Sequence, residues 1–277
     1  MKKLSLFVLL SSLLNNTFGQ ITTAVNPTIA QMQALLQGNG VVVSGLTITC
    51  PAGAYATFNN AASTLGGTLN SGILLTTGTA SNVAGPAVNT TASNLSYDNL
   101  APGSTLGNSF AGGTTYDGCY INFMITPSCA TLSINYVFAS EEYPEWVGST
   151  YNDVFGFVLS GPNPGGGSYV NQNLSVIPGT STPVTINNVN AGSNGAYYIS
   201  APPNLEYDGR TTILTASATV VPCQTYSMTI GVWDDGDGSL DSGVFLDVNG
   251  LSCANQPSLT ATVNPTTTCG PQTVTLT

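Results

Sequence analysis

The sequence predicts an all-β fold: a β-sandwich, jelly-roll-like, with one short N-terminal helix. Short apolar runs rich in Val, Ile, Thr, Tyr and Phe recur along the chain, and Gly, Pro, Asn or Ser bound each of them. Many short strands without intervening helices are typical of a sandwich or jelly roll. A hydrophobic share of 42% supplies enough apolar surface to offset chain entropy, which argues against disorder.

The N-terminus has the features of a secretory signal peptide over residues 1–19. Lys2 and Lys3 precede an apolar run over residues 4–14, and small residues lead to a cleavage site after Gly19. That run is shorter than the roughly 18 apolar residues that suggest a membrane span, and no later run reaches that length. We therefore expect a secreted or cell-surface protein without membrane insertion.

One helix is expected over residues 27–36, where apolar residues recur at helical spacing after Asn26 as cap and Pro27 in the first turn. The strands are the apolar runs that follow. They are expected over residues 41–50, 72–77, 120–125, 132–139, 154–159, 174–177, 184–189, 211–215, 226–233 and 244–248. We expect these elements to form one domain over residues 20–255.

The last residues, 256–277, differ in composition from the rest. They contain no acid, are rich in Thr and carry two short strand-like runs around Cys269. So few residues do not bury a core of their own. We interpret them as the incomplete start of a second β domain.

Composition excludes several classes of function. The chain has 13 acidic residues against three Lys and Arg, no His, and a net charge of −10. With Lys2 and Lys3 in the signal peptide, Arg210 is the only basic residue left. Such a chain repels phosphate backbones and anionic lipid, so nucleic acid is not an expected partner. Without His, His-based triads and zinc sites with nitrogen ligands are excluded.

The acids gather in two short segments, over residues 141–153 and 234–247. Clustered hard oxygen ligands suit calcium, which takes roughly six to eight oxygens. Asp235, Asp237, Ser239 and Asp241 alternate as in the start of an EF-hand loop, but Leu240 stands where that loop requires Gly. We therefore expect a calcium loop between two strands. The candidate ligands in both segments are Glu141, Glu142, Asn152, Asp153, Asp234, Asp235, Asp237, Ser239 and Asp241.

Structural alternatives exist for each segment. The Asp-Gly pairs of the second segment also suit a hairpin that needs positive φ. Glu141 or Glu142 can cap a turn or pair with Arg210. Asn152 and Asp153 can open the next strand through an Asx turn.

Two strands share a layout that bears on this site. Cys129 and Cys223 each precede an alternating strand, and an acid follows each of them at the same spacing, at Glu141 and Asp235. If the two strands run side by side in the same direction, both acidic segments meet in one composite cation site and Cys129 pairs with Cys223. Coincidence is the alternative, because any half-buried strand alternates.

Four long motifs carry a resemblance to a known family. They are FASEEYPEWV at 138–147, IPGTSTPVTINNV at 177–189, EYDGRTTILT at 206–215 and VWDDGDGSLDSGVFL at 232–246. In this order they resemble the choice-of-anchor L domain of exported Bacteroidota proteins, over about residues 41–253. The resemblance implies an extracellular module without catalytic residues, next to Ig-like or PKD-like repeats and a sorting signal, often for type IX secretion. It also implies the pairing of Cys119 with Cys223.

Two functions remain as hypotheses. The first is a non-catalytic, calcium-binding surface module that adheres to an extracellular glycan or a surface protein. Sugar rings would stack on aromatic residues near the loops, for which the candidates are Tyr143, Trp146, Tyr151 and Trp233. The second is a secreted glycoside hydrolase with Glu142 and Asp153 as acid and base. The chain has no nucleophile motif and no His, which favours the first.

Overall fold

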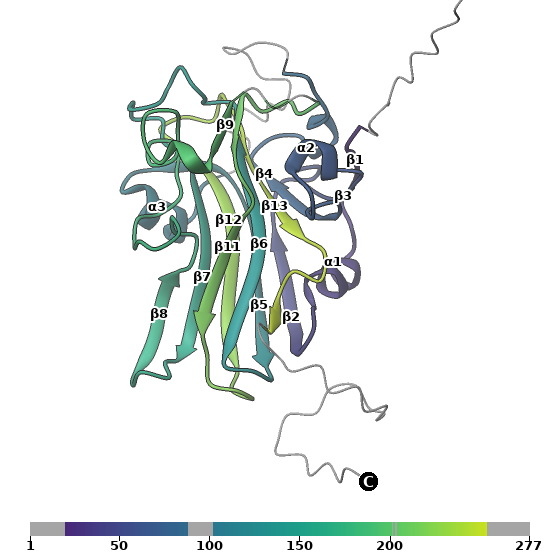
Figure 1. Cartoon of the computed structure of the whole chain (residues 1–277), viewed down its shortest axis with the longest axis vertical. Helices are drawn as coiled ribbons and strands as arrows, with labels where there is room; N and C mark the ends of the chain where they lie inside the picture. The colour runs from purple at the N-terminus through teal and green to yellow at the C-terminus, as the bar shows by residue number, and fades with distance from the viewer. Residues whose placement is uncertain (1–19, 88–101, 201, 203, 254–277) are drawn as a thin grey trace, which may run out of the picture.

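The computed structural model describes residues 20–87, 102–200, 202 and 204–253. The expected signal peptide and the expected start of a second domain lie outside these residues. Two antiparallel sheets pack face to face (Figure 1), so the predicted all-β sandwich is confirmed.

The larger sheet is organised around one long central strand, β6. The strands β11 and β10 pair with one edge of β6, and β14 and β13 pair with the other. The order across the sheet is β1-β3-β4-β13-β6-β10-β9. Its strands are β1 (Thr22–Val25), β3 (Tyr55–Asn59), β4 (Gly72–Thr76), β6 (Thr131–Ser140), β9 (Tyr198–Ser200), β10 (Gly209–Thr211), β11 (Leu214–Thr219), β13 (Ser242–Asp247) and β14 (Ser252–Cys253).

The smaller sheet has the order β2-β5-β12-β7-β8. Its central strand, β12, pairs antiparallel with β5 on one side and β7 on the other. Its strands are β2 (Val41–Thr49), β5 (Thr115–Pro127), β7 (Val154–Pro162), β8 (Ser168–Asn173) and β12 (Tyr226–Asp235). The strands β6 and β12, which share a sequence layout, therefore lie in different sheets, so the condition that they run side by side is not met.

Three α-helices lie in the described part of the chain. The first, α1 (Ile29–Leu36), matches the expected helix, but its cap is Thr28 and not Asn26. Thr28 and Gln31 form a capping box, which satisfies two backbone N–H groups at the helix start. The short helices α2 (Ala62–Leu65) and α3 (Thr105–Ala111) were not expected from the sequence.

Two predicted strands are wrong. Residues 174–177 and 184–189 form irregular structure with single bridges to Pro183 and Val154. Their apolar side chains are nevertheless buried in the core, among them Ile177 and Val184. The apolar residues in these two segments therefore indicate burial in the core, and not strand structure. There are two other differences: the run at 211–215 is divided between β10 and β11, and β1, β3, β8, β9 and β14 were missed.

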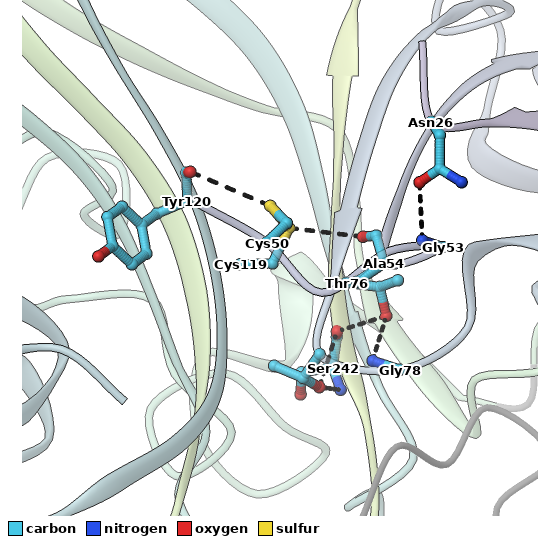
Figure 2. The surroundings of a disulfide bond; sticks show 10 residues. Asn26, Cys50, Gly53, Ala54, Thr76, Gly78, Cys119, Tyr120 and Ser242 are labelled. Atoms are coloured by element: carbon cyan, nitrogen blue, oxygen red, sulfur yellow. Dashed lines mark hydrogen bonds between the residues drawn. A yellow bond between two sulfur atoms is a disulfide. The ribbon is translucent and has the colours of Figure 1, made fainter. Parts of the chain in front are cut away.

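Two disulfides tie the sandwich together, and neither involves Cys223. Cys50, after β2, bonds Cys119 in β5, with Cα atoms 4.1 Å apart (Figure 2). Cys129, before β6, bonds Cys253 in β14, with Cα atoms 5.6 Å apart. Cys223 is a free thiol, and Cys269 lies outside the described residues.

Both expected pairings of Cys223 are therefore wrong, and strand register gives the reason. Cys119 lies opposite Val232, whereas Cys223 precedes β12 at the other end and donates its N–H to Pro127. Cys119 and Pro127 are eight positions apart in β5, which corresponds to about 26 Å of strand and is far beyond disulfide reach. Cys129 lies nearer, but its sulfur is bonded to Cys253.

We predict that removing the Cys129–Cys253 bond lowers the free energy of unfolding by about 2–5 kcal/mol, because the bond closes a long loop in the unfolded chain. Replacing both residues by Ser and measuring urea unfolding checks this, with Cys223→Ser as the control that leaves stability nearly unchanged. Non-reduced peptide mapping tests the pairing directly, and a Cys119–Cys223 crosslink would contradict the structure.

Candidate functional site

The two acidic segments meet at one end of the sandwich, where each of them connects the two sheets: the first runs from β6 to β7 and the second from β12 to β13. The N–H of Glu141 donates to the carbonyl of Asp241 at 3.0 Å. In return, the N–H of Asp241 donates to Glu141 Oε2 at 3.0 Å. Glu141 thus caps the second segment at the end of the β6–β13 pair within the larger sheet, which agrees with the alternative that Glu141 caps a turn.

Polar side chains replace apolar ones where the core reaches this end. In β12 the series of buried, core-facing residues runs through Ile230 and Val232 and continues, at the same spacing of two, to Asp234. The other strands follow the same rule, with a polar residue two positions beyond the last core residue. These residues form a polar end layer: Thr77 after β4, Asp117 in β5, Asp153 before β7, Asp234 in β12 and Ser242 in β13.

Every residue of this layer is buried, and so are the acids beside it. Asp153 and Asp234 are each 1% exposed, and Asp241 is fully buried. We call the six carboxylates at this end the buried acid cluster. Its members are Asp117, Glu141, Glu142, Asp153, Asp234 and Asp241.

Hydrogen bonds satisfy part of the cluster. Asp153 accepts from Ser242 Oγ at 2.6 Å and from the N–H of Asp235 at 3.0 Å. Asp241 accepts from Thr77 Oγ1 at 3.3 Å. By contrast, neither carboxylate oxygen of Asp234 accepts a hydrogen bond of normal geometry, although the Thr77 hydroxyl lies near enough to lower its pKa. A carboxylate buried in this state is costly, so Asp234 requires either a proton or a cation.

The pKa values of three acids in the cluster are raised, which also indicates that these carboxylates need a proton or a cation. Burial, then Asp153, Asp237 and Glu141, raise the pKa of Glu142 to about 9. Burial raises the pKa of Asp153 to about 7, although its hydrogen bond from Ser242 opposes this. Burial, then the charges of Asp153 and Asp241, raise the pKa of Asp234 well above its ordinary value.

Arg210, the only basic residue in the described part of the chain, does not neutralise these acids. It is buried, its Nη1 donates to the carbonyl of Thr211, and burial lowers its pKa to about 10. A guanidinium partner would lower the pKa of Glu142, whereas that pKa is raised. This counts against the pairing of Glu142 with Arg210.

Asp117 and the two hydroxyls were missed by sequence reasoning. Asp117 lies at a bulge in β5, where the register against β12 shifts between Val232 and Asp234, and its φ is 44°. An Asp-Gly pair inside an apolar strand, here Asp117 and Gly118, was the available signal for this bulge. Nothing in the local sequence marks Thr77 and Ser242, because strand pairing brings them here.

The remaining candidate ligands lie nearer the surface. Asp235 and Asp237 are half-buried and Ser239 is exposed. Asp237 accepts from the N–H of Ser239, which makes an Asx turn at the tip of the hairpin. Asn152 accepts from the N–H of Asn187 and so holds a neighbouring loop.

The described residues contain no group of three or more His, Cys, Asp or Glu side chains that is arranged to hold a metal ion. A cation at this end therefore needs carboxylates to rotate, or needs hydroxyl and backbone carbonyl oxygens to complete its ligands.

A second group of acids lies next to this end. Burial, then Glu145 and Glu206, raise the pKa of Asp208 to about 7. Burial, then Asp208 and Glu145, raise the pKa of Tyr198. We call Glu145, Glu206 and Asp208 the rim acids. With them, every described acid except Asp247, at the far end of β13, belongs to one of two electrostatically linked groups: the buried acid cluster with Asp235 and Asp237, and the rim acids.

The four aromatic candidates divide into two buried and two surface residues. Tyr143 is fully buried and donates its hydroxyl to the carbonyl of Val189 at 2.6 Å. Trp233 is fully buried against Phe110 of α3. Trp146 is 38% exposed, and its ring meets that of Tyr151 edge-on, with centroids 5.1 Å apart.

We predict that the metal-free domain loses stability as pH rises from about 5 to about 8. Glu142 has an ordinary pKa of 4.5 and a folded pKa of about 9, so the folded state holds more protons than the unfolded state in this window. The free energy of unfolding then falls by up to about 1.4 kcal/mol per pH unit for each such group. Thermal melts in chelator check this, and Glu142→Gln should flatten the slope. A stability that rises with pH would refute it.

Comparison with known sequences adds one match. The sequence model of the choice-of-anchor L domain family matches residues 21–252, a range that contains both sheets and both acidic segments. Searches of curated proteins and of solved structures found no match. In the described residues, no helix is long and apolar enough to cross a membrane.

Proposed function

The chain belongs to the choice-of-anchor L domain family, and from this premise we propose that it is a calcium-stabilised attachment module. Family membership supports a surface-associated, non-enzymatic module, and the two disulfides of the described residues fit an extracellular protein. The proposal adds calcium in the buried acid cluster and attachment to an extracellular glycan or surface protein. Origin in Bacteroidota, type IX export and an Ig-like or PKD-like repeat after residue 255 belong to the same proposal.

Asp234 is the observation that carries the calcium proposal. It is 1% exposed, neither of its carboxylate oxygens accepts a hydrogen bond of normal geometry, and the charges of Asp153 and Asp241 act on it. Buried carboxylates that repel one another are stabilised by a cation between them. The site offers oxygen ligands only, and calcium prefers these.

Calcium also suits the incomplete geometry better than a more demanding ion. It accepts roughly six to eight oxygens from carboxylates, carbonyls, hydroxyls and water in flexible arrangements, whereas magnesium requires a near-ideal octahedron. We infer Asp153, Asp234 and Asp241 as ligands, and Thr77 and Ser242 as nearby hydroxyls able to complete them. Asp235, Asp237 and Ser239 would then shape the hairpin tip without binding this ion.

One observation favours a second candidate, a glycoside hydrolase. The raised pKa values of Glu142 and Asp153 are what a general acid needs. However, both side chains are buried, Glu142 at 3% exposure, and a polysaccharide chain does not reach them there. A bound cation would also lower both pKa values and keep the carboxylates ionised. We therefore favour attachment without turnover.

We predict that calcium raises the melting temperature, because an ion bound only by the folded state adds about 2.7 kcal/mol at a hundredfold excess over its Kd. Asp234→Asn should abolish this increase, and it should stabilise the metal-free domain because it removes a buried charge. Asp247→Asn, an acid at the far end of β13, is the matched control and should keep the increase. Equal melting temperatures of the wild type in calcium and in chelator would refute the calcium proposal.

We also predict retention on a polymer or cell surface without cleavage. Purified protein in calcium is passed over immobilised polysaccharides and surface proteins, and both retention and released products are measured. We expect calcium-dependent retention with no product. Reproducible glycan cleavage that Glu142→Gln abolishes would replace the attachment function with the hydrolase.

A further inference from the structure

An aromatic pair, the exposed Trp146 and the half-buried Tyr151, lies at the acidic end of the sandwich. Trp146 is 38% exposed and packs edge-on against Tyr151, whereas Trp233, the other Trp of the chain, is fully buried. We call Trp146 and Tyr151 the aromatic platform. A large aromatic side chain left at the surface on a fixed neighbour is typical of a contact residue, because Trp and Tyr contribute most to many interfaces.

The loop that carries the platform is held rigidly. The N–H of Trp146 donates to the carbonyl of Glu142 at 3.1 Å, and the N–H of Ser149 donates to the carbonyl of Trp146 at 2.9 Å. Asn187 then donates from Nδ2 to the carbonyl of Ser149 at 3.1 Å. A surface that is ordered before binding loses little conformational entropy when a partner docks.

Within the platform, Tyr151 is the residue that contacts the second acidic segment. Its ring packs on Gly236 so closely that a Cβ added at Gly236 would lie 2.9 Å from Tyr151 Cδ1. Gly236 stands between Asp235 and Asp237, so two half-buried acids adjoin this side of the platform.

Acids adjoin the platform on the Trp146 side as well. Glu145 precedes Trp146, is exposed, and acts on the neighbouring Asp208. Arg210 is buried and occupied by the carbonyl of Thr211, so it does not offset these charges. An aromatic face between carboxylates attracts cations, which bind the ring face and the carboxylates together.

The cavity between β8 and β11 is a weaker candidate for a binding site. It has a volume of about 360 Å³, and its lining contains neither an aromatic nor a charged side chain. The platform has both.

We propose that the aromatic platform docks a Lys- or Arg-bearing segment of a partner protein, with one cationic side chain over Trp146 and the carboxylates of Glu145 and Asp237 at its edge. The inference rests on the proposed attachment function, because it names the class of partner. Arg fits best, since its planar guanidinium stacks on an aromatic face and bonds carboxylates in the same plane. A neutral glycan would form no ionic contact with the carboxylates around the platform, and an anionic glycan would be repelled by them.

The test measures binding of a labelled oligoarginine peptide to the full chain in saturating calcium, by fluorescence anisotropy. Trp146→Ala should weaken binding about tenfold, and Trp146→Phe should weaken it less because it keeps a ring face. Glu145→Gln should also weaken binding and reduce its salt dependence. Val170→Ala is the matched control, because Val170 is 80% exposed in β8 and should not matter.

Intrinsic fluorescence gives a second readout in the wild type. A docked peptide should change the emission of the partly exposed Trp146 and leave that of the buried Trp233, and Trp146→Phe should lose the change. Equal peptide affinities of Trp146→Ala and Val170→Ala would overturn the proposal. It is also overturned if Trp146 is needed for a neutral or amino-sugar oligosaccharide that binds more tightly than oligoarginine.

The calcium proposal and the docking inference can be refuted independently of each other. A calcium-induced shift in melting temperature without peptide binding refutes the docking inference alone. Peptide binding that depends on Trp146, in a protein that calcium does not stabilise, refutes the calcium proposal and supports docking.

Discussion

The structure depends on how an apolar core ends in buried carboxylates. In β12 and β7 the series of buried apolar residues ends in Asp234 and Asp153, which are themselves buried. Removing such groups from water costs several kcal/mol each unless a proton, a hydrogen bond or a cation compensates. Hydrogen bonds compensate Asp153, but Asp234 accepts none of normal geometry. This imbalance is the reason for expecting a bound ion.

A cation at this position would do more than offset charge. Asp234 ends β12, Asp153 precedes β7, and Asp241 precedes β13 in the opposite sheet. An ion shared by these residues would join the two sheets at an end where loops, and not apolar packing, close the sandwich. Disulfides fix other parts of the same framework, at Cys50–Cys119 and Cys129–Cys253. The proposed aromatic platform would then project from an end that calcium stiffens.

Sequence reasoning predicted what depends on local pattern. Alternation and turn residues gave the sandwich and most strands, and acid clustering marked the end of the molecule that carries the candidate site. Long-range pairing was beyond it: Asp117 enters through a bulge, and Thr77 and Ser242 arrive on strands distant in sequence. The predicted disulfide pairings were wrong for the same reason, since only strand register shows that Cys119 lies far from Cys223. The strands predicted at 174–177 and 184–189 were wrong because a buried irregular segment has the same run of apolar residues as a buried strand.

The most direct test of the account is to locate the ion. Crystals grown in calcium, and measured by anomalous diffraction, should give a peak about 2.3–2.6 Å from an Asp234 carboxylate oxygen, with Asp153 or Asp241 also in contact. The peak should be absent from crystals of Asp234→Asn. Well-ordered wild-type density with Asp234 unliganded, or a peak confined to the turn formed by Asp237 and Ser239, would contradict the central claim.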